Sequence, residues 1–211
     1  MSGESNVVNF YVLCNKLKDI IRTGWKLWGV KRERVESIAE HVYGVQMLAI
    51  AMWSEFRYDI DIVKVLSMLA VHELEEITIG DLTFFDVDLK SKNEMGHKAI
   101  EQVLAQLQRG EDVNDLILEF DERKTPEAQF SFFCDKLEAD LQSKIYDEQN
   151  CVNVNSEVYR NMKNNEKIKD TFKGKKTWSE WWLDYSAGKY NYDENFLSVS
   201  NYVKNNEILK K

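Results

Sequence analysis

The chain has 211 residues, 44% of them hydrophobic, and a net charge of −8 from 28 lysines and arginines against 36 aspartates and glutamates. This length and composition predict one globular domain with a substantial core, and they exclude intrinsic disorder. The acidic excess argues against binding to the phosphate backbone of a polynucleotide, which needs a clustered basic face. With one proline, the chain is expected to be mostly helical, and its three histidines are few enough to be considered singly.

The cysteines and the apolar segments bear on the compartment. Cys14, Cys134 and Cys151 show no CxxC spacing, so neither a disulfide framework nor a thiolate zinc site is expected. No apolar run approaches the roughly 20 residues of a membrane span, and the N-terminus does not have the pattern of a signal peptide. We therefore expect a soluble, cytoplasmic protein that does not bind membranes.

The hydrophobic pattern predicts an all-α fold, a single helical bundle of about six or more helices. In chain order, helices are expected at 9–22, 35–56, 62–79, 90–108 and 113–122. Thr125, Pro126 and Glu127 then supply the N-cap, the first-position proline and the first-turn acid of a further helix. After residue 150 the pattern weakens. Because the chain has no repeat and no Pro/Gly/Ser-rich linker, 1–211 is expected to form one domain, with 149–211 as a C-terminal helical extension.

One histidine faces the predicted core. In the helix expected at 35–56, Val45, Leu48 and Met52 lie four, seven and eleven residues after His41. His41 therefore heads the buried stripe of that helix. A lone histidine in such a place can simply be a hydrogen-bonded core residue.

The next predicted helix, 62–79, carries His72, Glu73 and Glu76 inside its apolar arc, with Glu75 at the margin. Burying two carboxylates beside an imidazole is costly unless they are paired, protonated or bound to a cation. The alternative is that this end of the helix emerges into solvent after Leu69.

The helix that Pro126 opens is apolar nearly all round, which is typical of a central, buried helix. Asp135 lies on one of its apolar stripes and needs a partner, either a lysine or a metal ion. Together with His41, His72 and one or two carboxylates, it makes a set of inward-facing ligands on separate helices. Such ligands suit Zn, Mn, Fe, Co or Ni, and a site of this kind polarises a phosphoryl or acyl oxygen and activates water.

Other motifs are incomplete or absent. His72 begins a sequence like the metalloprotease HExxH, but Glu76 stands where the second histidine is needed. Asp86 and Asp88 do not make a calcium loop, because the required glycine and glutamate are missing. The sequence has no P-loop, no dinucleotide-binding glycine pattern and no GxSxG.

The order His41, His72-Glu73, Asp135 resembles the H…HD…D metal site of the HD-domain metal-dependent phosphohydrolases, with the 5′-deoxynucleotidase branch as the closer resemblance. The resemblance covers about 10–148 and rests on five segments: RTGW at 22–25, SIAEH at 37–41, HELEEITIGDL at 72–82, KTPEA at 124–128 and DKLE at 135–138. It implies a helical HD fold, usually a homodimer, that binds one divalent metal ion, whether Mn, Co, Zn, Fe, Ni or Mg.

The resemblance also implies roles for single residues. His41, His72 and Asp135 match the family's ligand positions, and Glu73 replaces the family's aspartate with a side chain one methylene longer. Two further acids match catalytic positions of the family, and one arginine matches its phosphate-binding position. These are Glu76, which would orient or activate the attacking water, Asp81, which would contact the sugar or the leaving oxygen, and Arg22.

The leading hypothesis is therefore an enzyme that removes phosphate from (deoxy)nucleoside 5′-monophosphates, with water activated at the metal and Glu76 accepting its proton. A second hypothesis is a degenerate HD module that binds a nucleotide or a partner without turnover, and Glu73 is the residue that motivates it. A third is an HD hydrolase of another phosphoester.

Overall fold

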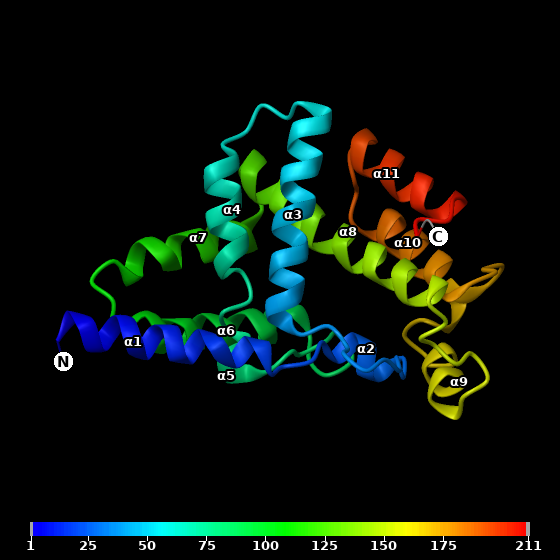
Figure 1. The fold of residues 1–211 in the computed structure, drawn as a ribbon, viewed down its shortest axis with the longest axis horizontal. Coiled ribbons are helices and arrows are strands. Elements are labelled where there is room, and N and C mark those ends of the chain that lie inside the picture. Colours follow the sequence, from blue (N-terminus) through cyan, green and yellow to red (C-terminus); the bar gives the residue numbers. More distant parts are fainter. Residues whose placement is uncertain (1, 210–211) are drawn as a thin grey trace. The chain divides into compact units, whose positions relative to one another are not determined.

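The computed structural model describes residues 2–209, and within that range the elements are helices joined by turns and loops, with two isolated β-bridges and no strand (Figure 1). The all-α prediction is confirmed. None of the helices in this range is long and apolar enough to cross a membrane. The chain divides into two compact units, one of the residues up to 23 with 36–132 and the other of 24–35 with the residues from 133 on. That the chain folds as a single domain stays a prediction.

The first unit contains α1 (Gly3–Cys14), the 3₁₀ helix η1 (Asn15–Lys18), α3 (Ile38–Phe56), α4 (Ile62–Val71), α5 (Glu76–Ile79), α6 (Leu89–Leu104), α7 (Gly110–Glu122) and the start of α8 (Pro126–Glu148). Helix α4 packs against α3 and α7, and α6 packs against α5 and α7 (Figure 1). One buried aliphatic cluster joins these helices: Leu17, Ile38, Leu74, Ile100, Val103, Leu104 and Ile117.

Helix α3 begins at Ile38, later than predicted, because Ser37 is its N-cap. The Ser37 hydroxyl accepts a hydrogen bond from the Glu40 N–H at 3.3 Å, and the Glu40 carboxylate accepts one from the Ser37 N–H at 2.9 Å. This capping box closes the first turn and fixes the direction in which the helix starts. His41 follows in that turn and is fully buried, as the apolar stripe predicts.

The helix predicted at 62–79 is wrong. Helix α4 ends at Val71, a tight turn covers 72–75, and α5 follows. The Leu69 carbonyl, which would accept the Glu73 N–H in a continuing helix, lies 2.7 Å from Nδ1 of His72 instead. The alternative of an exposed helix end is also wrong, because His72, Glu73 and Glu76 are 4%, 8% and 1% exposed.

Other predicted boundaries are also wrong. The chain begins its first helix at Gly3 rather than at residue 9, because the Ser2 hydroxyl caps it, and it tightens into η1 after Cys14. Helix α6 ends at Leu104 rather than at residue 108. Just beyond, α7 starts so close to the Leu104 carbonyl that a Cβ at Gly110 would collide with it.

The second unit contains α2 (Thr23–Leu27), the rest of α8, α9 (Glu157–Lys163), the 3₁₀ helix η2 (Lys169–Phe172), α10 (Trp178–Lys189) and α11 (Glu194–Asn205). Its core is aromatic. The Trp28 and Trp181 rings lie 5.1 Å apart, and Phe172 stacks on Trp181 at 4.6 Å. The weak helical pattern after residue 150 thus belongs to short elements that pack through rings rather than through a regular aliphatic stripe.

Helix α8 also buries a carboxyl group whose hydrogen-bond donors among the described residues are neutral hydroxyls. Asp140 is fully buried, and it accepts hydrogen bonds from the Ser186 hydroxyl at 2.8 Å and the Tyr192 hydroxyl at 3.5 Å. Burial raises the pKa of Asp140 well above its usual range, and the two hydroxyls offset this only in part. The folded state therefore favours the protonated form.

Because the pKa of Asp140 is raised on folding, this group costs stability as the pH rises from about 4 through its folded-state pKa. We expect Asp140→Asn to raise the midpoint of thermal unfolding at neutral pH by about a few degrees, since the amide keeps the acceptor for Ser186 and cannot ionise. The gain should vanish near pH 4. Thermal scans between about pH 4 and pH 8 measure it.

Asp184 is the control, because Lys175 and Lys204 contact it at 2.5 and 2.7 Å and lower its pKa against the effect of its partial burial. A group of this sign stabilises the protein above its unfolded-state pKa and loses that effect as the pH falls. Asp184→Asn should therefore lower the midpoint at neutral pH, where Asp140→Asn raises it. Equal shifts of the same sign would refute the assignment.

Candidate metal centre

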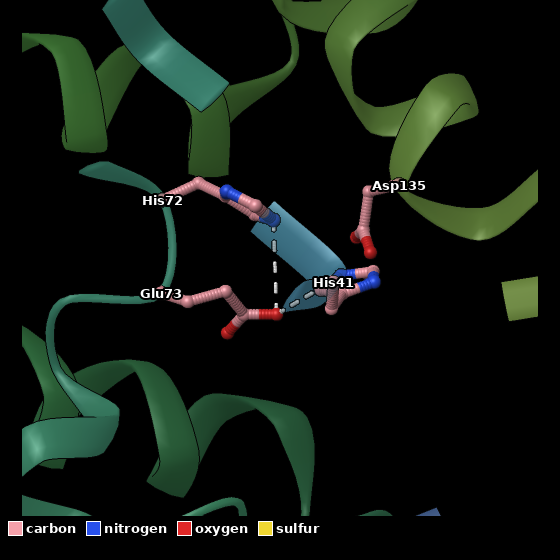
Figure 2. Close-up of side chains that lie close together, drawn as sticks. All are labelled: His41, His72, Glu73 and Asp135. Carbon is pink, nitrogen blue, oxygen red and sulfur yellow. Dashed lines mark ion pairs between the residues drawn. The ribbon is translucent and has the colours of Figure 1, made fainter. Parts of the chain in front are cut away.

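The start of α3 and the turn after α4 bring two imidazoles and a carboxylate together. Oε1 of Glu73 lies 3.6 Å from Nε2 of His41 and 3.7 Å from Nε2 of His72, as the dashed lines in Figure 2 mark. The two imidazole rings are 5.7 Å apart. All three residues are buried, so the charge of Glu73 is compensated inside the protein rather than by solvent.

The three side chains fit a divalent metal ion. Ligand atoms that bind one ion at about 2.0 to 2.2 Å lie about 3 to 3.6 Å from one another, and the separations at Glu73 are close to that. The bond between Nδ1 of His72 and the Leu69 carbonyl makes Nδ1 the donor. This leaves the lone pair of the neutral ring on Nε2, the atom that faces Glu73, as in histidines that bind metals.

Glu73 reaches the imidazoles despite its extra methylene, and its position involves Arg22. Nη1 of Arg22 lies 3.3 Å from the same Oε1 atom. The backbone of Arg22 is held by a hydrogen bond from its N–H to the Glu36 carbonyl at 3.0 Å, next to the bridge between Ile21 and Ser37. The structure thus brings Arg22 to the histidine pair.

Asp81 lies at the far end of α5 and is tied to the segment of Arg22. Gly80 ends the helix with a φ of 73°, a conformation that favours glycine. The carboxylate of Asp81 then accepts a hydrogen bond from the Thr23 N–H, the residue after Arg22. Asp81 therefore positions the backbone next to Arg22.

Glu76, at the start of α5, is 1% exposed. Its Oε1 accepts a hydrogen bond from Nζ of Lys92 at 3.0 Å, and its Oε2 is buried with no hydrogen bond from any of the described residues. Burial, and then the charges of Glu73 and Asp81, raise the pKa of Glu76 well above its usual range. Burial and Glu73 likewise raise the pKa of Glu75 to about 8. This turn therefore concentrates acids that need cations.

Asp135 lies on α8 within the second unit and is 4% exposed. A lysine was one of the two partners expected from the sequence, and Nζ of Lys136 lies 2.7 Å from Oδ2 of Asp135. Three of the four predicted ligands thus belong to the first unit and converge there, and Asp135 belongs to the second.

Sequence reasoning missed Lys92. It lies in the first turn of α6, where the positive end of the helix dipole disfavours a lysine. That position, opposite a segment with three glutamates, was the available signal.

Comparisons with known proteins identify the family of this chain. A model of the HD domain matches residues 14–176. The chain is 33% identical to a 5′-deoxynucleotidase of Dictyostelium discoideum over 69% of this chain and 80% of that protein. It is 30% identical to a 5′-deoxynucleotidase of Schizosaccharomyces pombe over 67% of this chain and 73% of that protein.

Solved structures show the same fold. A conserved hypothetical protein from Pyrococcus furiosus superposes with a TM-score of 0.60 and 27% identity, over 77% of this chain and 98% of that one. A predicted metal-dependent phosphohydrolase from Magnetospirillum magnetotacticum superposes with a TM-score of 0.66 over 95% of this chain and 92% of that one, and at 19% identity it supports the fold alone. The resemblance drawn from the sequence is confirmed, and this chain belongs to the HD-domain family.

Proposed function

We propose that this protein is a metal-dependent phosphomonoesterase that removes phosphate from (deoxy)nucleoside 5′-monophosphates. The observation that carries the proposal is the buried group of His41, His72 and Glu73, with Glu76 and Arg22 beside it. The relatives named as 5′-deoxynucleotidases support the choice of substrate.

In this proposal one divalent ion, whether Mn, Co, Zn, Fe, Ni or Mg, is held by His41, His72, Glu73 and Asp135. The inclusion of Asp135 follows the resemblance to the family's ligand positions and is supported by the burial of its carboxylate within α8. Its contact with Lys136 occupies Oδ2 and is compatible with ligation through the other oxygen. The bound ion would polarise a phosphoryl oxygen and lower the pKa of a water molecule.

The protein's own groups then divide the remaining work. Glu76 accepts the proton of the attacking water through Oε2. Arg22 neutralises charge on the phosphate, because its guanidinium has five N–H donors and the contact with Glu73 uses one nitrogen. Asp81 holds the Thr23 N–H and so the place of Arg22, and as the resemblance implies, it contacts the sugar or the leaving oxygen.

The charge of the site favours a substrate with a single phosphate. Arg22 is paired with Glu73 and Lys92 with Glu76, so each of these cations is already partly compensated by a protein carboxylate. A polyphosphate would bring additional negative charge into an acidic turn, which is electrostatically unfavourable. We further propose that the enzyme acts as a homodimer in the cytoplasm, and its three free cysteines support a reducing compartment.

One observation favours a second candidate, the degenerate HD module that binds a nucleotide or a partner without turnover. The ion pair with Arg22 gives Glu73 a counter-charge that does not require a metal. Such a module would be stabilised by a nucleotide in the absence of added metal and would release no phosphate.

Metal binding is tested through stability. We expect Mn²⁺ or Co²⁺ at about 100 times its dissociation constant to add about 2.7 kcal/mol to the free energy of unfolding, which is several degrees in the midpoint. His72→Ala should remove this metal-dependent shift because it removes a ligand. His97→Gln is the matched control, since the third histidine is 38% exposed and pairs with Asp121. A shift that survives in His72→Ala would contradict the ligand assignment.

Turnover is tested with a panel of nucleoside monophosphates and triphosphates, by phosphate release from the metal-loaded protein. We expect release from the 5′-monophosphates and a loss of about 10² to 10⁴ in kcat for Glu76→Gln, because the base is replaced by a neutral amide. The metal-dependent stabilisation should persist in that variant. Nucleotide-induced stabilisation of the wild type with no phosphate release would instead establish the binding module.

A further inference from the structure

The Glu76 carboxylate is fixed through one oxygen only. Among the described residues, Lys92 is the side chain that donates to Oε1, at 3.0 Å, and Oε2 is buried without a hydrogen bond. A carboxylate held in this way cannot rotate freely, because rotation would break the contact to the ammonium group. Its second oxygen therefore has a defined direction.

The position of Lys92 is set by how α6 starts and by how closely it packs. Asp88 caps the helix by accepting from the Ser91 N–H at 3.0 Å and from the Ser91 hydroxyl at 2.7 Å. One turn after Lys92, on the same face, comes Gly96, where a Cβ would lie 3.1 Å from Cγ of Glu75. The glycine lets α6 approach the turn before α5, and that approach brings Lys92 within reach of Glu76.

Lys92 occupies an energetically unfavourable position, which its contact with Glu76 offsets. A lysine in the first turn of a helix is opposed by the helix dipole, and its side chain here is only 24% exposed. Although burial would lower its pKa, the charges of Glu73 and Glu76 and the hydrogen bond to Glu76 raise the pKa of Lys92 on balance, so it is a cation at neutral pH. By contrast, Lys90 in the same turn is 86% exposed and pairs with the exposed Glu94 at 3.8 Å.

We propose that Lys92 is a positioning residue, which holds Oε1 of Glu76 so that Oε2 is the oxygen presented to the attacking water. This inference rests on the proposed function, in which Glu76 accepts the proton of that water. Lys92 acts through Glu76 and touches neither the substrate nor the metal. Arg22 and Lys92 then have separate tasks, since Arg22 pairs with Glu73 and Lys92 pairs with Glu76.

The kinetic test compares Lys92→Met and Lys92→Arg with Lys90→Met in the metal-loaded enzyme, with a nucleoside 5′-monophosphate as substrate. Lys92→Met should lower kcat by about 10- to 100-fold and leave KM within about twofold, because the base is misplaced but the substrate contacts remain. Lys92→Arg should recover most of kcat, since a guanidinium can donate to the same oxygen, and Lys90→Met should match the wild type. A rise in KM at constant kcat would mean that Lys92 binds the phosphate and would overturn the inference.

A double-mutant cycle with Glu76→Gln separates coupling from general damage. In the Glu76→Gln background, Lys92→Met should lower kcat no further. In thermal unfolding without substrate or metal, the double variant should lose less than the sum of the two single losses, because each single change leaves a buried partner uncompensated. Additive effects in both measurements would refute the pairing.

The wild-type control distinguishes the two levels of the proposal. If the wild type releases phosphate and Lys92→Met behaves like Lys90→Met, the role of Lys92 is refuted and the proposed function stands. If the metal-loaded wild type releases no phosphate from any nucleotide, the proposed function is refuted and the role of Lys92 with it, and thermal coupling would then report an ion pair alone.

Discussion

The hydrogen bond between Nδ1 of His72 and the Leu69 carbonyl is the constraint on which the site depends. It uses the carbonyl that would continue α4, so the chain turns, and the turn directs His72, Glu73 and Glu76 inward. The same bond selects the tautomer that leaves Nε2 as the ligand atom facing Glu73. One side-chain contact thus ends a helix, orients a ligand and creates the segment that carries the proposed base.

That turn concentrates negative charge, and the surroundings are arranged to compensate it. Burial raises the pKa values of Glu75 and Glu76, and the charge of Glu73 raises both further. Arg22 belongs to a segment whose backbone N–H groups are hydrogen-bonded to Glu36 and Asp81. Lys92 belongs to α6, which can pack closely against Glu75 because residue 96 is a glycine. A divalent ion beside Glu73 would add to this compensation, and its loss would leave the ion pair with Arg22 as a counter-charge for Glu73.

How far the sequence predicted these features depends on whether local or distant contacts decide them. The start of α3 and the burial of His41 follow from the Ser37 capping box and a regular apolar stripe, and both are local. The burial of His72, Glu73 and Glu76 was predicted through a helix that does not exist. Helical periodicity correctly predicted which residues face inward. The hydrogen bond from the His72 side chain to the Leu69 carbonyl, however, determines where the helix ends.

Hydrophobic periodicity did not predict the contacts of residues whose partners lie far away in the sequence. Lys92 contacts Glu76 from another helix, and its unusual first-turn position is visible in the sequence of α6, but the pattern within α6 does not identify Glu76 as the partner. In the aromatic core of the second unit, Trp28 packs against Trp181, which is more than a hundred residues later in the chain. A local sequence pattern therefore cannot predict this contact. Tertiary packing, rather than helix propensity, determines both.

Two buried aspartates on α8 show how partners separate a candidate ligand from a structural group. Asp135 has the ammonium of Lys136 at 2.7 Å, so a cation already lies beside its carboxylate. Asp140, five residues later, accepts hydrogen bonds from the hydroxyls of Ser186 and Tyr192, and burial raises its pKa, which favours the protonated form. Burial alone would rank these two acids alike. The charge of the nearest partner distinguishes them, and by that criterion only Asp135 is suited to bind a cation.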